Sequence, residues 1–269
     1  DFGTSKGLSA NNVRIILQDS WENMWLGTSG GGINKYHGQQ FQHYNLEEGY
    51  LDGKFYSVLG GSHNTVWTGT GHFGFAEMRN DSIIYHNQNT DFHNYKCKVL
   101  FEDHIGNIWI GTEGKGVYIF NGGDYIQISG KQGLADDWIR SITQDKDFNI
   151  WIATVGGISK LTPTNYADLN FTIRNFRQEN GLPDDRINNL APDNENRIWF
   201  GTNNGHIGYI QNGKITNYGI NDGIKKSVIK SIKFDKHNQL WAGTEGEGLF
   251  QADLKSNFIT FNQIKKRTE

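Results

Sequence analysis

Six tryptophans recur along this chain of 269 residues at a nearly constant spacing. They are Trp25, Trp67, Trp109, Trp151, Trp199 and Trp241, and successive numbers differ by 42, 42, 42, 48 and 42. A fixed period of this length indicates a repeat architecture in which one unit cannot bury its own faces and must stack on its neighbours. The chain is therefore best interpreted unit by unit.

Each tryptophan lies in a recurring phrase, such as Asn-Ile-Trp-Ile-Gly-Thr at 107–112 and Arg-Ile-Trp-Phe-Gly-Thr at 197–202. An aspartate stands six residues before five of the six tryptophans, and Gly61 replaces it in the second unit. The residues between are rich in glycine and asparagine, which tolerate the dihedral angles of tight turns, and aspartate can bond the turn backbone. The pattern predicts a hairpin around each tryptophan.

Four short strands are predicted in the first unit, at 13–18, 23–28, 32–36 and 41–44, with equivalents in the other five. The predicted fold is all-β, a β-propeller of six four-stranded blades in a single domain over 1–269, with the first strand of each blade nearest the axis. The six extra residues between Trp151 and Trp199 fall within 162–170 and predict a longer hairpin in the fourth blade. Excision from a longer sensor protein, or from a seven-bladed parent, remains open.

Composition narrows the classes of partner and cofactor. The net charge of −3 argues against a general polyanion binder, and nucleic-acid binding lacks a basic surface. No apolar run approaches the roughly 20 residues that span a bilayer, so no membrane contact is expected of this segment. Cys97 is the single cysteine and takes a core position, and no metal-ligand spacing or phosphate-binding motif predicts a metal or another cofactor.

A resemblance rests on the sequence Gly-Leu, Val-x-x-Ile-x-x-Asp, a turn, Trp-x-Gly-Thr, Gly-Gly-Ile and Phe-x-x-Tyr. The repeat at 8–44 carries it best, 133–160 and 181–218 carry it well, and 52–85 departs most. This pattern resembles the two-component regulator propeller repeat, which builds the periplasmic sensor region of hybrid two-component histidine kinases. The resemblance implies a periplasmic or extracellular sensor, often of glycan fragments, that signals through a neighbouring propeller or sensor domain or a second protomer. No kinase or receiver motif occurs in this chain.

One register at the start of the predicted inner strands suggests a binding site. Its six residues can all donate hydrogen bonds: Arg14, Tyr56, Lys98, Arg140, Asn188 and Lys230. In a ring they would face one mouth, where a positive field would suit a small anionic or carbohydrate ligand. Trp138, in the loop before one of these strands, could stack on a sugar. The alternative is that the basic chains fill a wet channel and pair with nearby aspartates, and that Trp138 packs against the next blade.

Two other functions stay open. His72, His206, Glu113 and Glu245 lie in loops of the same predicted face, where propeller lyases that act on polysaccharide or lactone-type substrates use histidine and acidic residues. Such chemistry needs a base near the proton to be abstracted and a cation for the developing charge, and the sequence does not show whether these residues converge. A protein-docking scaffold is the third possibility. The sensor is favoured over the enzyme because the nine histidines are scattered.

Overall fold

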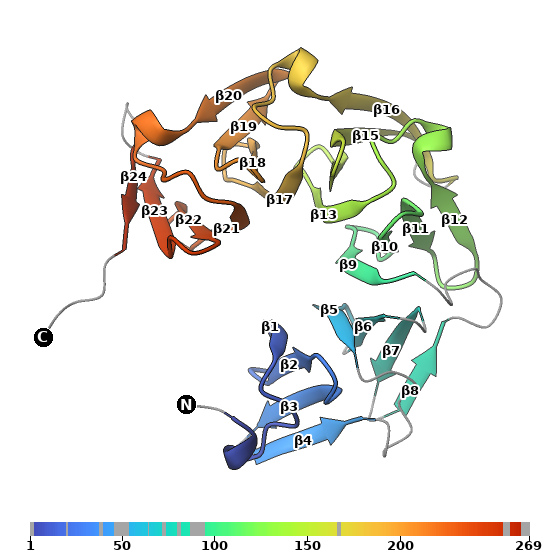
Figure 1. Cartoon of the computed structure of the whole chain (residues 1–269). Coiled ribbons are helices and arrows are strands. Elements are labelled where there is room, and N and C mark those ends of the chain that lie inside the picture. The colour runs from blue at the N-terminus through green and yellow to red at the C-terminus, as the bar shows by residue number, and fades with distance from the viewer. Residues whose placement is uncertain are drawn as a thin grey trace, which may run out of the picture. The chain divides into compact units, whose positions relative to one another are not determined.

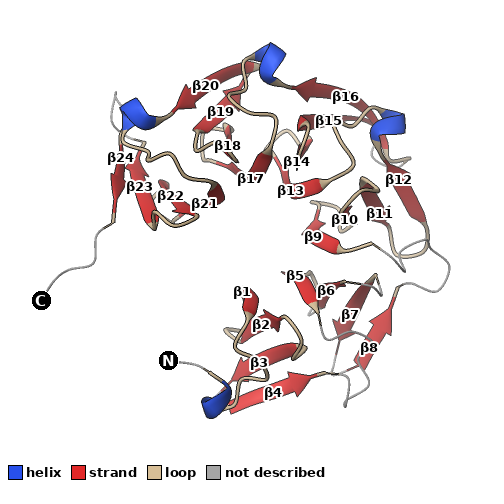
Figure 2. Ribbon diagram, viewed as in Figure 1, coloured by secondary structure: helices blue, strands red, loops and turns tan. Residues whose placement is uncertain are grey.

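The structure is a computed structural model, and it describes residues 3–19, 21–37, 40–45, 54–63, 65–71, 74–79, 82–86, 95–165, 168–254 and 259–264. Within these ranges lie six four-stranded antiparallel sheets, blades 1 to 6 in chain order, whose strands pair in sequence order (Figure 1). Four short 3-10 helices, η1 (Thr4–Lys6), η4 (Gly130–Gln132), η5 (Gln178–Asn180) and η6 (Ile220–Asp222), precede blades 1, 4, 5 and 6 (Figure 2). The predicted fold class, an all-β propeller with six four-stranded blades, is confirmed.

The contacts divide the chain into two compact units, Asp1–Gln127 and Ile128–Glu269. The first unit holds blades 1 to 3, with strands β1 (Val13–Gln18), β2 (Met24–Thr28), β3 (Ile33–His37), β4 (Gln40–Tyr44), β5 (Phe55–Gly60), β6 (Val66–Thr70), β7 (Phe75–Arg79), β8 (Ser82–Tyr85), β9 (Cys97–Glu102), β10 (Ile108–Thr112), β11 (Val117–Phe120) and β12 (Tyr125–Ile128). The second holds blades 4 to 6, with strands β13 (Ile139–Gln144), β14 (Ile150–Thr154), β15 (Gly157–Asn165), β16 (Asn170–Phe176), β17 (Ile187–Pro192), β18 (Ile198–Thr202), β19 (Ile207–Gln211), β20 (Lys214–Tyr218), β21 (Ile229–Phe234), β22 (Gln239–Thr244), β23 (Leu249–Asp253) and β24 (Phe261–Gln263). A single domain over 1–269 stays a prediction.

The strands of blade 1 agree with the predicted bounds to within a residue at each end. The six extra residues of blade 4 lengthen the outer hairpin, as predicted, because β15 and β16 pair from Ile158 and Phe176 to Asn165 and Asn170. In this hairpin the two outer strands of the blade reach beyond the inner pair.

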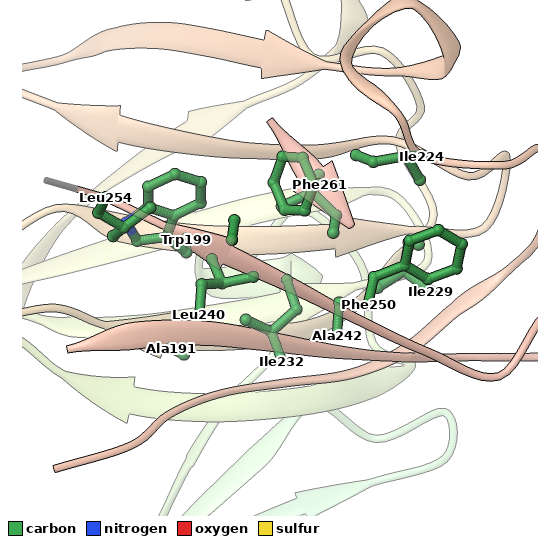
Figure 3. Packing of buried hydrophobic residues seen from close by; sticks show 12 residues of the cluster. Ala191, Trp199, Ile224, Ile229, Ile232, Leu240, Ala242, Phe250, Leu254 and Phe261 are labelled. Carbon is green, nitrogen blue, oxygen red and sulfur yellow. The ribbon is translucent and has the colours of Figure 1, made fainter. Parts of the chain in front are cut away.

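Hydrophobic packing between neighbouring blades follows the tryptophan repeat. In the second unit, Trp199 of β18 is fully buried in a cluster with Ile232 and Leu240 of blade 6 (Figure 3). In the first unit, Trp25 clusters in the same way with Phe55 and Val58 of blade 2. Within each unit, these tryptophans thus pack against the inner strand of the next blade, which explains why they recur once per repeat.

Cys97 begins β9 and is completely buried. Burial raises the pKa of its thiol to about 12, so the thiol stays protonated at neutral pH. The predicted core role of this residue is confirmed.

Candidate functional site

The six residues predicted to bind ligand share a backbone feature that the sequence did not reveal. Each is the extra residue of a β-bulge at the start of the inner strand of its blade, where the pairing shifts by one residue. The six are Arg14, Tyr56, Lys98, Arg140, Asn188 and Lys230. A bulge re-aims a side chain away from the ordinary alternation of a strand, and bulges are frequent beside functional sites.

In the first unit, the three bulge residues come together around one aromatic ring. The guanidinium carbon of Arg14 lies 4.9 Å from the centre of the Tyr56 ring, and Nζ of Lys98 lies 4.4 Å from it. Nζ of Lys96, at the loop end before β9, lies 5.9 Å from the same centre. Cations over a tyrosine face are attracted by the negative face of the ring, so Tyr56 holds three cationic side chains close together. We call Arg14, Tyr56, Lys96 and Lys98 the cation cluster.

Glu113 is the carboxylate partner of this cluster. Its Oε2 accepts a hydrogen bond from Nζ of Lys96 at 2.8 Å, and its Oε1 lies 3.2 Å from Nζ of Lys98. Burial acts to raise the pKa of Glu113, but the hydrogen bonds and charges of Lys96 and Lys98 outweigh it and lower the pKa. The hydrogen bond and charge of Glu113 in turn raise the pKa of Lys96. Glu113 and Lys96 are therefore charged at neutral pH, and Arg14, Lys96 and Lys98 place three basic side chains against one carboxylate.

Arg14 has one further partner, the hydroxyl oxygen of Ser29, which accepts a hydrogen bond from its Nη2 at 3.1 Å. Its side chain is exposed, whereas Lys98 keeps 26% of its side-chain surface and Glu113 keeps 13%. The Lys98 and Glu113 side chains are thus partly buried, whereas the guanidinium of Arg14 is accessible to solvent. An accessible guanidinium can grip a carboxylate, sulfate or phosphate with two parallel hydrogen bonds.

In the second unit, the bulge residues lie on the inner strands β13, β17 and β21, and neighbouring inner strands contact each other. Arg140 is exposed. Asn188 donates through Nδ2 to the carbonyl oxygen of Ile229 at 3.0 Å, and Nζ of Lys230 lies 2.9 Å from Oε2 of Glu245. Asn188 therefore ties blade 5 to blade 6, and Lys230 has an exposed carboxylate partner. That all six bulge residues face one mouth stays a prediction.

Trp138 is 46% exposed in the loop before β13. Its backbone N–H donates to Oδ1 of Asp136 at 2.7 Å, and its carbonyl oxygen accepts from the N–H of Val155. The loop is thus held by hydrogen bonds while much of the indole stays accessible, two residues before Arg140. An accessible aromatic beside a cation is compatible with the predicted sugar-stacking role.

The residues named for a lyase are placed as follows. His72 lies outside the described residues. Nδ1 of His206 lies 2.9 Å from Oδ1 of Asn204, Glu113 belongs with the cation cluster, and Glu245 pairs with Lys230. A carboxylate with a lowered pKa is a weak base, so Glu113 is poorly suited to proton abstraction.

Two negative findings concern only the described ranges. Histidine, cysteine, aspartate and glutamate side chains there form no group of three that could hold a metal ion. No helix in the same ranges has the length and apolar character needed to cross a bilayer.

Sequence reasoning missed Lys96 as a site residue. Lys96 precedes Lys98 by two residues, and Glu113 follows the strand that pairs with β9. Two lysines so spaced beside an acidic loop position are the signal that was present. Their contact with Tyr56 depends on packing between blades 2 and 3, which no local pattern contains.

Comparison with known proteins supports the predicted resemblance. The model of the family described as two component regulator propeller matches residues 7–30 and 181–204, which lie at blades 1 and 5. No curated protein matches the chain.

Among solved structures, the chain is similar to the extracellular domains of two hybrid two component systems from B. thetaiotaomicron. The first has a TM-score of 0.81 at 24% identity over 95% of this chain, and the second has 0.75 at 22% over 99%. The chain spans 34% of the length of each of these domains. Virginiamycin B lyase from Staphylococcus aureus is also similar, with a TM-score of 0.75 at 16% identity over 95% of this chain and 85% of the lyase. At these identities the likeness shows the fold, which a sensor and a lyase share.

Proposed function

We propose that this chain is a ligand-sensing propeller of a two-component signalling protein and that it works outside the cytoplasm. Its regulator propeller repeats and its similarity to extracellular domains of hybrid two component systems support this proposal. The ligand is a small anion or an acidic carbohydrate, and it binds at the inner-strand bulges.

The cation cluster is the observation that supports an anionic ligand. Arg14, Lys96 and Lys98 converge on Tyr56, and Glu113 balances one of the three positive charges. A carboxylate, sulfate or phosphate group on the ligand adds the missing negative charge. Arg14 is the primary contact, because its guanidinium is accessible and has five donors, of which Ser29 uses one.

The second unit contributes in the same way in this proposal. Arg140 offers a second accessible guanidinium at an equivalent bulge, and Trp138 offers a flat apolar surface for the ring of a sugar. Asn188 and Lys230 complete the set of polar bulge residues. Within the second unit, a ligand with both a charged group and a pyranose ring would use Arg140 for the first and Trp138 for the second.

Signalling follows from differential binding. A ligand shifts a conformational equilibrium only by its difference in affinity for the two states. We propose that the second state differs in how this propeller contacts a neighbouring propeller or sensor domain, or a second protomer. Residues at bulges suit such a role, because they lie where the inner strands of adjacent blades meet.

Thermal unfolding against a panel of saccharides tests the ligand class. The panel contains uronic-acid oligosaccharides with and without sulfate, saturated at their non-reducing ends, together with free glucuronate and neutral disaccharides. A ligand that binds only the folded state at a hundred times its Kd stabilises by about 2.7 kcal/mol, which raises the midpoint by about 5 °C in a domain of this size. We expect that rise with acidic probes, its loss in Arg14→Ala and Lys98→Met, and no change in Lys214→Ala, which removes an exposed cation at the start of the outer strand β20 in blade 5.

The same mixtures distinguish the competing functions. Cleavage of an oligosaccharide, followed by the ultraviolet absorbance of the new double bond, would support the lyase and direct attention to His206. No stabilisation by any acidic probe would contradict the proposed ligand class. Equal stabilisation of wild type and Arg14→Ala would contradict the proposed site while leaving the sensor role standing.

A further inference from the structure

Blade 1 has a hollow at the end opposite to the cation cluster. Arg14 lies at the start of β1, whereas Trp21 lies in the turn that follows the end of β1. The hollow has a volume of about 450 Å³, within the range of about 300–1,000 Å³ for small-molecule sites. Trp21, Phe41 and side chains of β3 and β4 line it.

Trp21 is held in a fixed turn. Oδ1 of Asp19 accepts hydrogen bonds from the backbone N–H groups of Trp21 and Asn23, both at 2.9 Å. Oδ2 of Asp19 accepts from the indole N–H of Trp25 at 2.8 Å, which anchors the turn to the core. The indole of Trp21 is 47% exposed on this rigid support. A fixed aromatic platform costs little conformational entropy when a ligand binds on it.

The wall that β3 and β4 contribute to the hollow is polar. Lys35 of β3 pairs with Gln42 of β4, and His37 pairs with Gln40, so all four side chains lie on one face of the hairpin. The ammonium of Lys35 lies 5.3 Å from the centre of the Trp25 ring. The two glutamine amides and the imidazole therefore supply donors and acceptors to the lining of the hollow.

The fold does not require an aromatic residue at position 21. The residues equivalent to Trp21 in the other five turns are His63, Ile105, Asp147, Glu195 and His237. An exposed indole leaves apolar surface in water, which is unfavourable unless a ligand covers it. The combination of a flat apolar ring with amide groups matches a pyranose, which has one face of C–H groups and a rim of hydroxyls.

We propose that this hollow is a second ligand site and that it binds a neutral pyranose sugar. The sugar ring stacks on Trp21, and its hydroxyls bond to Gln40, Gln42 and His37. The proposal is independent of the anion site, because the cation cluster and this hollow share no residue. Loss of one site by mutation should leave the other intact.

Fluorine NMR of protein labelled with 5-fluorotryptophan tests the proposal. The chain has eight tryptophans, and Trp21→Phe identifies the Trp21 resonance by its disappearance. We titrate cellobiose, xylobiose, mannobiose and chitobiose as neutral probes, with glucuronate as the acidic comparison. We expect a saturable shift of the Trp21 resonance with at least one neutral disaccharide, and calorimetry to show binding weakened about tenfold or more in Trp21→Ala.

Two further variants serve as controls for this experiment. Gln42→Ala removes an amide without touching the turn and should weaken binding as well. Phe148→Ala removes a 47%-exposed aromatic from the corresponding turn of blade 4 and should leave binding unchanged. Thermal midpoints of all variants show whether they fold.

Three outcomes would overturn the proposal. The Trp21 resonance does not shift with any probe, the affinity is unchanged in Trp21→Ala, or the shift depends on the protein concentration and not on the sugar concentration. The last would indicate self-association through this face. Because Arg14→Ala is titrated in parallel, failure of this site is distinguishable from failure of the anion site.

Discussion

The carboxylate of Asp103 accepts a hydrogen bond from the indole N–H of Trp109 across 2.9 Å, in the interior of blade 3. The same carboxylate also accepts from the backbone N–H groups of Ile105 and Asn107 and from the Asn107 side chain. One aspartate thus fixes both the turn and the indole ring of the buried Trp109. Four further blades repeat this bond at 2.7–3.0 Å, through Asp19, Asp145, Asp193 and Asp235.

Replacing Asp103 with alanine should destabilise the protein by about 3 kcal/mol. The substitution leaves several buried donors without acceptors, and each such group costs about 1–3 kcal/mol before water or local rearrangement compensates. Urea unfolding followed by tryptophan fluorescence measures the change. Asp124→Ala, an exposed aspartate of the same blade, should change stability little, and an equal loss in both variants would contradict the role of the Asp103 carboxylate.

Stability should fall in acid through the aspartates of these turns. Burial acts to raise the pKa of Asp19, but hydrogen bonds from Trp25, Asn23 and Trp21 lower it below its ordinary value. The indole hydrogen bond of Trp241 likewise lowers the pKa of Asp235. A lowered pKa in the folded state stabilises above the unfolded pKa, about 3.9, and this contribution is lost as pH falls through the folded value.

Urea midpoints between pH 7 and pH 2 test this dependence. Asp19→Asn should be less stable than wild type at pH 7, and the difference should shrink below about pH 4, where the wild-type carboxylate also becomes neutral. A difference that stays constant with pH would show that the charge of Asp19 is not the cause.

The sequence predicted the fold well because the fold is encoded in local, repeated signals. The tryptophan spacing and the Gly-rich and Asn-rich turns locate blade 1 strands to within a residue, and the extra residues at 162–170 locate the long hairpin of blade 4. The aspartate was predicted to bond the turn backbone, which is confirmed. Its bond to the indole was not predicted, because that bond depends on how the side chains at 103 and 109 meet across the hairpin.

Blade 2 shows what happens where the aspartate is missing. Gly61 takes its place, and a Cβ atom there would lie 2.7 Å from Nε1 of Trp67 and 2.5 Å from Oγ1 of Thr65. The indole therefore occupies space that an aspartate side chain would need. We expect Gly61→Asp to destabilise by about 1–3 kcal/mol, as overpacking does, instead of restoring the turn of the other blades.

Gly61→Ala is the matched variant, because it adds Cβ without a carboxylate. Both variants should lower the urea midpoint. If Gly61→Asp raises it while Gly61→Ala lowers it, Trp67 can rotate to bond the new carboxylate, and the steric argument is wrong.

The candidate site was predictable only in part. The register of Arg14, Tyr56 and Lys98 was visible as a set of donors at one repeat position, and the structure brings these three together. The sequence could not show that the position is a β-bulge, or that Arg14 and Lys98 both lie over the ring of Tyr56. Both depend on pairing and on contacts between blades, which have no local sequence signature.

Glu113 already forms ion pairs with the two lysines that an anionic ligand would use. Its two carboxylate oxygens lie 2.8 Å and 3.2 Å from the ammonium nitrogens of Lys96 and Lys98. A ligand anion must share or displace this carboxylate, so Glu113→Gln should tighten binding of acidic disaccharides by roughly three- to tenfold, as one like charge removed near the surface can do. Thermal stability without ligand should fall slightly, because two lysines lose their counter-charge.

Calorimetric titration of the acidic probes at two salt concentrations measures this effect. The gain should shrink at high salt, because exposed charges are screened over about 8–10 Å at physiological ionic strength. Glu247→Gln, which removes a partly exposed carboxylate paired with Lys225 in the second unit, is the control and should not alter affinity to the same extent. Weaker binding in Glu113→Gln would mean that Glu113 orients Lys96 and Lys98 for the ligand and does not compete with it.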